Sequence, residues 1–417
     1  MNRALLFILL LLAEPSMVHA ETITLSFEDL PTLVSGRNKN VLAGQAAVDG
    51  AKSQTGHLER SFLPKIRAEG GGEIFQTGNS SRRTQPVGAV EGRLNLFRGG
   101  QDLLEGKILK TQENLAQANL AQGFSRELAR SRFLFSDAVY YGELLRSIQR
   151  ALATTQGHIG LVRKQIQSGL TTESDRLEFD MFHNQLKRVQ ILAHDDYEHA
   201  LEELKAVLGW SQEVKIKIND VVKGTGKDLL SEMKFNPGNH HEFLIFKKKG
   251  EIAELHKKQS YRWWTPSLEA YGGYALYPFR EREYPALWNR DESVGGLKIS
   301  VNLFDALQSR TQGKAFQYQA KAYKLEAEQK SRELEAVFEK LEHELKSRRE
   351  LIRLLNQNVR TGQQYLKMSS EEYGRGVKTG PQLLEASQRH FQEMQNLAET
   401  RREQFRIQAE LMALLGR

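Results

Sequence analysis

The side chains that most often carry chemistry are scarce or badly spaced in this sequence. The neighbouring pair His240-His241 invites a metal-site interpretation, but adjacent histidines lack the helical spacing that places two imidazoles on one face. The glycine runs Gly70–Gly72 and Gly295-Gly296 lie in strand-like segments, without the lysine of a phosphate-binding loop. No serine, histidine and acid arrangement stands out, and the chain has no cysteine. We therefore expect no enzymatic activity, no cofactor and no metal site.

The formal net charge is +7, and the charged residues are spread along helix-like stretches in which lysines and glutamates are mixed. Such mixing is typical of a solvated helical surface, and no basic patch interleaved with aromatic residues appears. We therefore expect no nucleic-acid partner.

The first twenty residues have the layout of a signal peptide. Arg3 precedes an apolar run over residues 4–13, and the segment closes with Val18-His19-Ala20. A membrane anchor is the alternative, but the run is shorter than the roughly twenty residues that span a bilayer. We expect export and cleavage after Ala20. No later segment is apolar enough for a transmembrane helix, so entry into a membrane would have to use strands.

An internal repeat organises the rest of the chain. The segment Asn95-Leu96-Phe97 recurs as Asn302-Leu303-Phe304, and the sequence LKAVLG that ends at Gly209 recurs as LMALLG, which ends at Gly416. Both pairs are displaced by 207 residues, since 302 minus 95 and 416 minus 209 give the same number. We interpret the chain as a tandem duplication of one unit, with the order helix, strand, strand, very long helix, helix.

The long helix of each unit has the pattern of a coiled coil. Apolar residues recur at sevens in the second unit, as in Phe338, Leu345 and Ile352, and a matching series occupies the first unit. No proline interrupts residues 101–175 or 305–380. Each helix can therefore run for about 70 residues, or roughly 100 Å. Several such helices side by side can wrap a cylinder.

Two pairs of strands precede the long helices. In the last strand, Leu297, Ile299, Val301 and Leu303 alternate with polar residues, which is the period of a membrane barrel. Four strands cannot close into a barrel, and open edges are not tolerated in hydrocarbon. Two copies would give a barrel filled by side chains, whereas three copies would leave a bore. A conduit therefore needs at least three copies.

The sequence resembles the TolC-like outer-membrane efflux family. The most specific part of the resemblance is a turn motif, a glycine with an acidic or amide residue six positions on and then leucine. It occurs over residues 168–177 and again over residues 375–384, at the ends of the two heptad helices. The motif is weak alone and strong when it is repeated at the 207-residue displacement.

The resemblance implies a mainly α fold with a transmembrane β part. Three chains would form a 12-stranded β-barrel in the outer membrane and a long α-helical coiled-coil barrel through the periplasm. The expected divisions are a signal peptide (1–20), a first repeat (21–209), an equatorial linker (210–238) and a second repeat (239–417). Within the repeats we expect a first helix at about 26–61, strands at about 64–97 and 266–304, and long helices at about 99–168 and 306–375.

The resemblance also implies a gate at the periplasmic tip. It places Tyr373 opposite Asp175 and Lys378 near Ser174, as links between helices that hold the tunnel shut. The alternative for Tyr373 is that it ends the apolar seam, because it occupies a seam position. Lys378 stands where many relatives have arginine, and lysine lacks the forked geometry of a guanidinium.

Two further sets of residues take roles from the resemblance. Glu385 and Gln382 stand where relatives often present two carboxylates as a selectivity ring, so this ring would hold three charges in a trimer instead of six. The alternative for Glu385 is an ordinary solvated helix residue. The turns would contact a periplasmic adaptor protein through Gly169, Leu170, Gly376 and Val377. Both glycines also suit the end of a helix.

The implied function is that of the outer-membrane duct of a tripartite efflux or type I secretion system. Its partners would be two further copies of the chain, the adaptor, an inner-membrane pump and outer-membrane lipid. The competing function is an exported coiled-coil scaffold or adhesin of the envelope, which would also have a signal peptide and long heptad helices. Paired amphipathic strands in both halves favour the duct, because a scaffold has no need of them.

Overall fold

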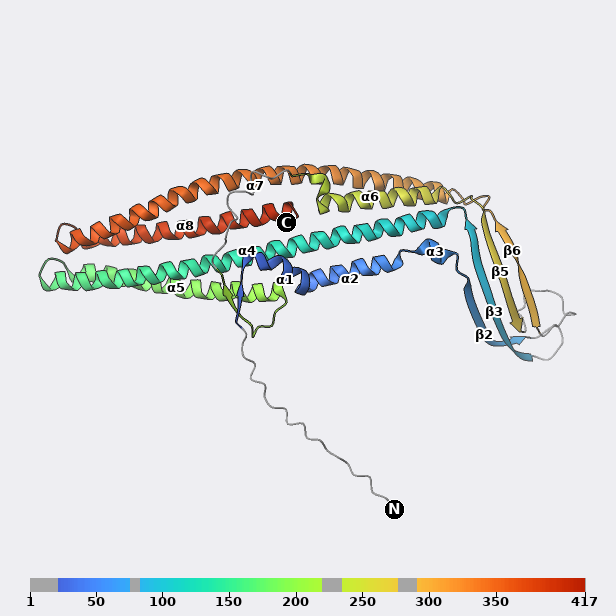
Figure 1. The fold of residues 1–417 in the computed structure, drawn as a ribbon, viewed down its shortest axis with the longest axis horizontal. Coiled ribbons are helices and arrows are strands. Elements are labelled where there is room, and N and C mark those ends of the chain that lie inside the picture. The colour runs from blue at the N-terminus through green and yellow to red at the C-terminus, as the bar shows by residue number, and fades with distance from the viewer. Residues whose placement is uncertain (1–21, 76–82, 220–234, 277–290, 417) are drawn as a thin grey trace, which may run out of the picture. The chain divides into compact units, whose positions relative to one another are not determined.

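The computed structural model describes residues 22–75, 83–219, 235–276 and 291–416, and the predicted signal peptide lies outside these ranges. The helices are α1 (Leu30–Arg37), α2 (Lys39–Gln54), α3 (His57–Ser61), α4 (Gln101–Gln167), α5 (Glu173–Leu208), α6 (His241–Ser260), α7 (Gln308–Gly374) and α8 (Gly380–Leu414). The strands are β1 (Thr22–Leu25), β2 (Lys65–Phe75), β3 (Arg83–Arg98), β4 (Lys215–Ile218), β5 (Ser267–Leu276) and β6 (Asp291–Ser300) (Figure 1). Short 3-10 helices precede α1 (η1, Phe27–Asp29) and α6 (η2, Pro237–Asn239).

The elements recur in the same order in the two halves of the sequence. The strands β2 and β3 are followed by α4 and α5, just as β5 and β6 are followed by α7 and α8. The helices α4 and α7 have the same length, 67 residues, close to the length expected from the proline-free stretches. The chain is therefore mainly helical, with two long helices.

Packing divides the chain into two compact units that do not follow the repeats. The first unit comprises residues 1–38, 127–232 and 344–410, and the second comprises residues 39–126, 233–343 and 411–417. Each unit contains segments of both repeats. A single repeat is therefore not an independently packed body.

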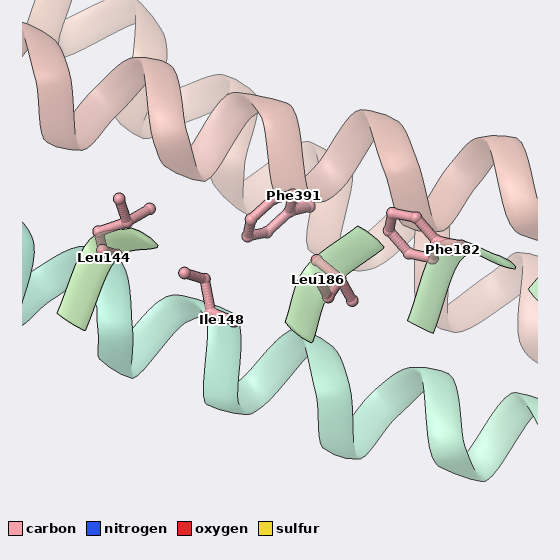
Figure 2. Close-up of a cluster of buried hydrophobic side chains, with 6 residues drawn as sticks. Leu144, Ile148, Phe182, Leu186 and Phe391 are labelled. Atoms are coloured by element: carbon pink, nitrogen blue, oxygen red, sulfur yellow. The ribbon is translucent and has the colours of Figure 1, made fainter. Parts of the chain in front are cut away.

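The first unit has a core in which helices of both repeats meet. Leu144 and Ile148 of α4 pack with Phe182 and Leu186 of α5 and with Phe391 of α8. Figure 2 shows the Phe391 ring pointing toward Ile148 and Leu186. These side chains are nearly excluded from solvent, so they hold the first repeat's helix pair against α8.

A short parallel sheet also stabilises the first unit, and the sequence did not predict it. Strand β1 pairs with β4, in register from Thr22 with Lys215 to Leu25 with Ile218. Strand β4 falls in residues 210–238, the segment that was expected to be the equatorial linker. Leu25, Ile216 and Ile218 are buried, so the alternation of β4 buries one face of the strand.

The second unit contains an antiparallel sheet in the order β2-β3-β5-β6. The register runs from β2 to β6 through rows of opposite residues, such as Ile66 with Gly92, Gly92 with Gly272, and Gly272 with Gly295. Within the described ranges, β2 and β6 are paired on one side only. Both are edge strands.

The two faces of this sheet differ in character, because side chains alternate between them. One face carries exposed apolar side chains from three of its strands, namely Ile66, Ile74, Val90, Leu297 and Ile299. The other face carries charges. Arg67 pairs with Glu69 at 2.6 Å, and Arg93 pairs with Glu91 at 2.7 Å.

Two expected elements have different bounds in the structure. Strand β6 ends at Ser300, so Val301 and Leu303 belong to the connection into α7, where the Asp305 carboxylate accepts backbone N–H bonds from Leu307 and Ser309. The first helix, expected over about residues 26–61, is divided. The chain leaves helical geometry at Asn38, whose side-chain amide donates to the Val207 carbonyl at 2.8 Å, and again near Gly56, which has a φ of 80°.

None of the helices in the described ranges has an apolar stretch long enough to cross a membrane.

Candidate functional site

The two predicted turns lie in the first unit and have the same backbone geometry. Gly169 and Gly376 adopt φ values of 71° and 74°, in the left-handed region that glycine tolerates best. The N–H of the residue after each glycine donates to a carbonyl five positions back: Leu170 to Gln165 at 3.0 Å, and Val377 to Glu372 at 2.9 Å. This is the Schellman arrangement, which satisfies the last carbonyls of α4 and α7.

The apolar residue of each turn is exposed. Leu170 has 68% of its surface accessible and Val377 has 72%, although a residue at this place in a Schellman motif usually packs back on its own helix. Both repeats therefore present a branched apolar side chain outward at equivalent positions. The geometry suits contact with another protein.

Tyr373 ends α7 inside a small apolar cluster. It is buried with Ile159, Val162, Phe179 and Leu383, so the seam interpretation of its ring is correct for the single chain. Its hydroxyl is buried, lies beside Thr171 and makes no hydrogen bond of good geometry within the described residues. Burial raises the pKa of the Tyr373 phenol, and the nearby Asp175 carboxylate adds to the rise.

Asp175 connects the turn of the first repeat to the start of α8. The Thr171 hydroxyl donates a hydrogen bond to its Oδ2. The same carboxylate lies so close to Gly380 that a Cβ built on that glycine would be 2.4 Å from Oδ2. The structure therefore brings Tyr373 and Asp175 into one cluster, with Thr171 and Gly380 as members that the sequence did not single out.

Lys378 is held by its own repeat. Its Nζ donates to the Ser369 hydroxyl at 2.8 Å, pairs with the Glu372 carboxylate at 3.0 Å and lies 4.4 Å from the centre of the Tyr365 ring. The bond to Glu372 raises the pKa of the Lys378 ammonium. In the described part of this single chain, Lys378 makes no hydrogen bond to Ser174.

The two predicted ring residues are in different situations. The Gln382 side-chain oxygen accepts the Thr379 backbone N–H at 3.0 Å, which is one half of a capping box at the start of α8. Glu385 is exposed and pairs with Arg389 of the next helical turn at 2.5 Å. Glu385 is therefore accessible as a charge, whereas Gln382 also holds the helix start.

A further residue joins the two long helices at the tip. The Gln165 side-chain amide, from the end of α4, donates to the carbonyls of Tyr373 and Gly374 at 3.4 and 3.2 Å. Both carbonyls belong to the last turn of α7, and the Tyr373 carbonyl also accepts the Gly376 backbone N–H at 3.0 Å. Nothing in the local sequence identifies Gln165, because its role depends on where α7 ends in space.

Comparisons with known proteins bear on this arrangement. Residues 259–417, from the end of α6 through β5, β6, α7 and α8, match the family model Outer membrane efflux protein. No curated protein sequence matches at a significant level.

Solved structures match over nearly the whole chain. CusC is similar with a TM-score of 0.78 and 14% identity, over 93% of this chain and 91% of that chain. VceC from Vibrio cholerae gives 0.78 and 12%, over 94% and 96%, and the open-state MtrE outer membrane channel from Neisseria gonorrhoeae gives 0.75 and 14%, over 94% and 88%. At such low identities the likeness defines the fold.

The described chain therefore has the fold of outer-membrane channel structures such as CusC and VceC. The family model for outer membrane efflux proteins matches the second repeat of the chain. Both comparisons agree with the resemblance inferred from the turn motifs.

Proposed function

We propose that the chain forms the outer-membrane channel of a tripartite efflux or type I secretion system, and that it conducts substrates passively. The observation that carries the proposal is the two-faced sheet. Exposed Ile66, Val90 and Ile299 lie on one face, and the ion pairs of Arg67 and Arg93 lie on the other. Such a sheet suits lipid on one side and water on the other.

The free edges of β2 and β6 support a shared barrel. An unpaired strand edge exposes backbone N–H and C=O groups, each of which costs several kcal/mol in hydrocarbon. Pairing β6 of one copy with β2 of the next removes both edges. Three copies give twelve strands and a bore, which supports a homotrimer embedded in outer-membrane lipid.

The exposed turn residues support a periplasmic partner. Leu170 and Val377 present apolar surface at equivalent places of the two repeats, next to the clustered residues Tyr373 and Asp175. We assign these turns, with Gly169 and Gly376, to an adaptor protein that connects the channel to an inner-membrane pump.

The competing function, an envelope scaffold or adhesin, is less well supported. A scaffold would use the long helices, but it would expose the apolar face of the sheet to water at a cost of about 25 cal/mol for each Å². The similar structures CusC and MtrE are also described as channels.

Conductance measurements test the proposal directly. The mature chain, extracted in detergent and added to planar bilayers, should produce discrete current steps, and its assembly should have the mass of three copies. A folded protein that stays monomeric without detergent and gives no current would contradict the channel and favour the scaffold.

A further inference from the structure

Gly380, the first residue of α8, is a glycine for a reason other than backbone conformation. Its φ is not among the positive values that occur at other glycines, such as Gly376. A glycine at a helix start forfeits helix propensity, so its presence calls for an explanation. The explanation lies in the space around it, because Gly380 is buried beside the first turn of α5.

Asp175 occupies the place where any other residue would carry its Cβ. An added Cβ at position 380 would lie 2.4 Å from Oδ2, 2.7 Å from Cγ and 3.0 Å from Cβ of Asp175. Rotation of the aspartate could move the carboxylate, but it would leave the Asp175 Cβ in place. The hydrogen bond from Thr171 also restrains the carboxylate. Relief of the clash therefore requires the backbones of α5 and α8 to separate.

The contact is one-sided, although the repeats are related by the 207-residue displacement. The position equivalent to Gly380 is Glu173, since 380 minus 207 gives 173, and the position equivalent to Asp175 is Gln382. Glu173 has a side chain, which pairs with Arg176, and Gln382 caps its own helix. Only the carboxylate of the first repeat can therefore seat on the helix start of the second.

We propose that Gly380 is a positioning residue for the closed tip. It lets the Asp175 side chain seat against the start of α8, which holds the turn of one repeat against the turn of the other. This role rests on the proposed channel function. A side chain larger than hydrogen at position 380 separates α5 from α8 and shifts the channel toward its open state.

The test is a double-mutant cycle read by channel opening. Gly380→Ala should raise the open fraction in planar bilayers about tenfold, since overpacking of a close contact typically changes an equilibrium by that factor or more. Asp175→Gly removes all three clashing atoms. It should raise the open fraction by itself, because it also removes the contact between α5 and α8. In that background, Gly380→Ala should change the open fraction much less, because the two residues act through one contact.

Gly374→Ala is the matched control. Gly374 ends α7 at the same tip, its φ is not positive, and an added Cβ would meet no atom within 4 Å. It should leave the open fraction unchanged. Pro381→Ala provides a second control, because a residue before proline is restricted in its own right. If Gly380→Ala acted through that restriction, Pro381→Ala would suppress its effect and Asp175→Gly would not.

The outcomes separate this inference from the channel proposal. A wild-type chain that forms no conducting trimer contradicts the channel. A conducting wild type with an unchanged Gly380→Ala variant contradicts only the role of Gly380. If Gly380→Ala fails to assemble, recovery of the trimer in the Asp175→Gly background supports the clash, and failure in both backgrounds overturns it.

Discussion

At the scale of single residues, equivalent positions of the two repeats have taken different tasks. Asp175 and Gln382 both occupy the third position of a helix that follows a turn. Asp175 reaches across to Thr171 and Gly380, whereas Gln382 folds back to the Thr379 N–H. The longer amide can reach its own helix start, and the shorter carboxylate is held by a neighbour. The duplication therefore produced one bridging residue and one capping residue.

The cluster around Tyr373 predicts how the tip should respond to mutation. Asp175→Ala combined with Tyr373→Phe removes the bridging carboxylate and the buried hydroxyl, and it keeps the apolar ring of residue 373. We expect a rise in single-channel conductance or open fraction in planar bilayers. Unchanged currents in a correctly assembled double mutant would assign both residues to packing or to adaptor contact.

Lys378 should contribute less to closure than the resemblance implied. Its ammonium is already held by Ser369 and Glu372 of its own repeat, so a contact with Ser174 would have to replace these bonds. We therefore expect Ser174→Ala to alter the open fraction less than Asp175→Ala does. The reverse order would show that Lys378 leaves its cluster in the assembled channel.

Ion selection should depend on Glu385. In the proposed trimer, three exposed Glu385 carboxylates at a narrow mouth would attract cations, and salt would screen them. Glu385→Gln should remove most of the cation preference in reversal potentials. Gln382→Asp should tighten block by multivalent cations, most strongly at low salt, but its shorter side chain also weakens the cap on Thr379. Gln382→Glu is the cleaner variant, because glutamate can cap and adds charge.

If Glu385→Gln leaves the preference intact, the ring lies elsewhere. Asp175 and Glu178 are then the candidates, since they are the equivalent positions of the first repeat.

At the scale of elements, α6 begins on a buried histidine in the second unit. The His240 Nδ1 accepts the Glu242 backbone N–H at 3.3 Å, so the neutral ring caps the helix. Burial, and then the neighbouring His241, lower the pKa of His240 to about 4. Glu242 opposes that shift and Lys330 adds to it. Protonation would place a charge in a buried site and remove the cap.

This cap predicts a loss of stability on acidification. An unfolded histidine titrates near 6.5, so the contribution of His240 is present above that pH and is lost as the pH falls toward about 4. The melting temperature of the wild type should therefore fall between pH 7 and pH 5. His240→Asn keeps a preferred capping residue without a titrating ring, and its melting temperature should fall less.

Some pH dependence should remain in the variant, because burial also lowers the pKa of His158 and His390. An equal fall in the two proteins would exclude His240 as a source of the acid sensitivity.

At the scale of the whole molecule, a single chain exposes surfaces that the proposed further copies and lipid would cover. Among the residues that the structure describes, the sheet has two unpaired edges and an exposed apolar face. The seam residues Phe338, Ile352 and Val359 remain partly exposed. Each of these features is costly for an isolated soluble chain, and the proposed trimer in a membrane would relieve all of them together.

The two faces of β3 offer a matched test of membrane insertion. Val90→Lys puts a charge on the apolar face near the middle of the strand, and in a bilayer this should cost about 2–4 kcal/mol. Ala89→Lys puts the same charge on the opposite face and should cost much less. The yield of trimer in the outer-membrane fraction measures the difference. Equal yields would contradict a lipid-facing role for the Val90 face.

The sequence by itself determined the periodic features of this protein. The 207-residue displacement, the absence of proline from two long stretches and the heptads predict two equivalent long helices, and α4 and α7 are those helices. The turn glycines were predictable for a similar reason, because a helix end that needs positive φ selects glycine locally. Such features depend only on neighbours in the chain.

The tertiary structure decided which residues of distant segments meet. Gly380 and Gln165 have no local pattern that identifies them, since their contacts depend on how close α4 and α5 lie to α7 and α8. The pairing of β1 with β4 is of the same kind. Periodicity specifies which face of an element is apolar. Close approach between backbones depends on packing in three dimensions, which a linear pattern does not contain.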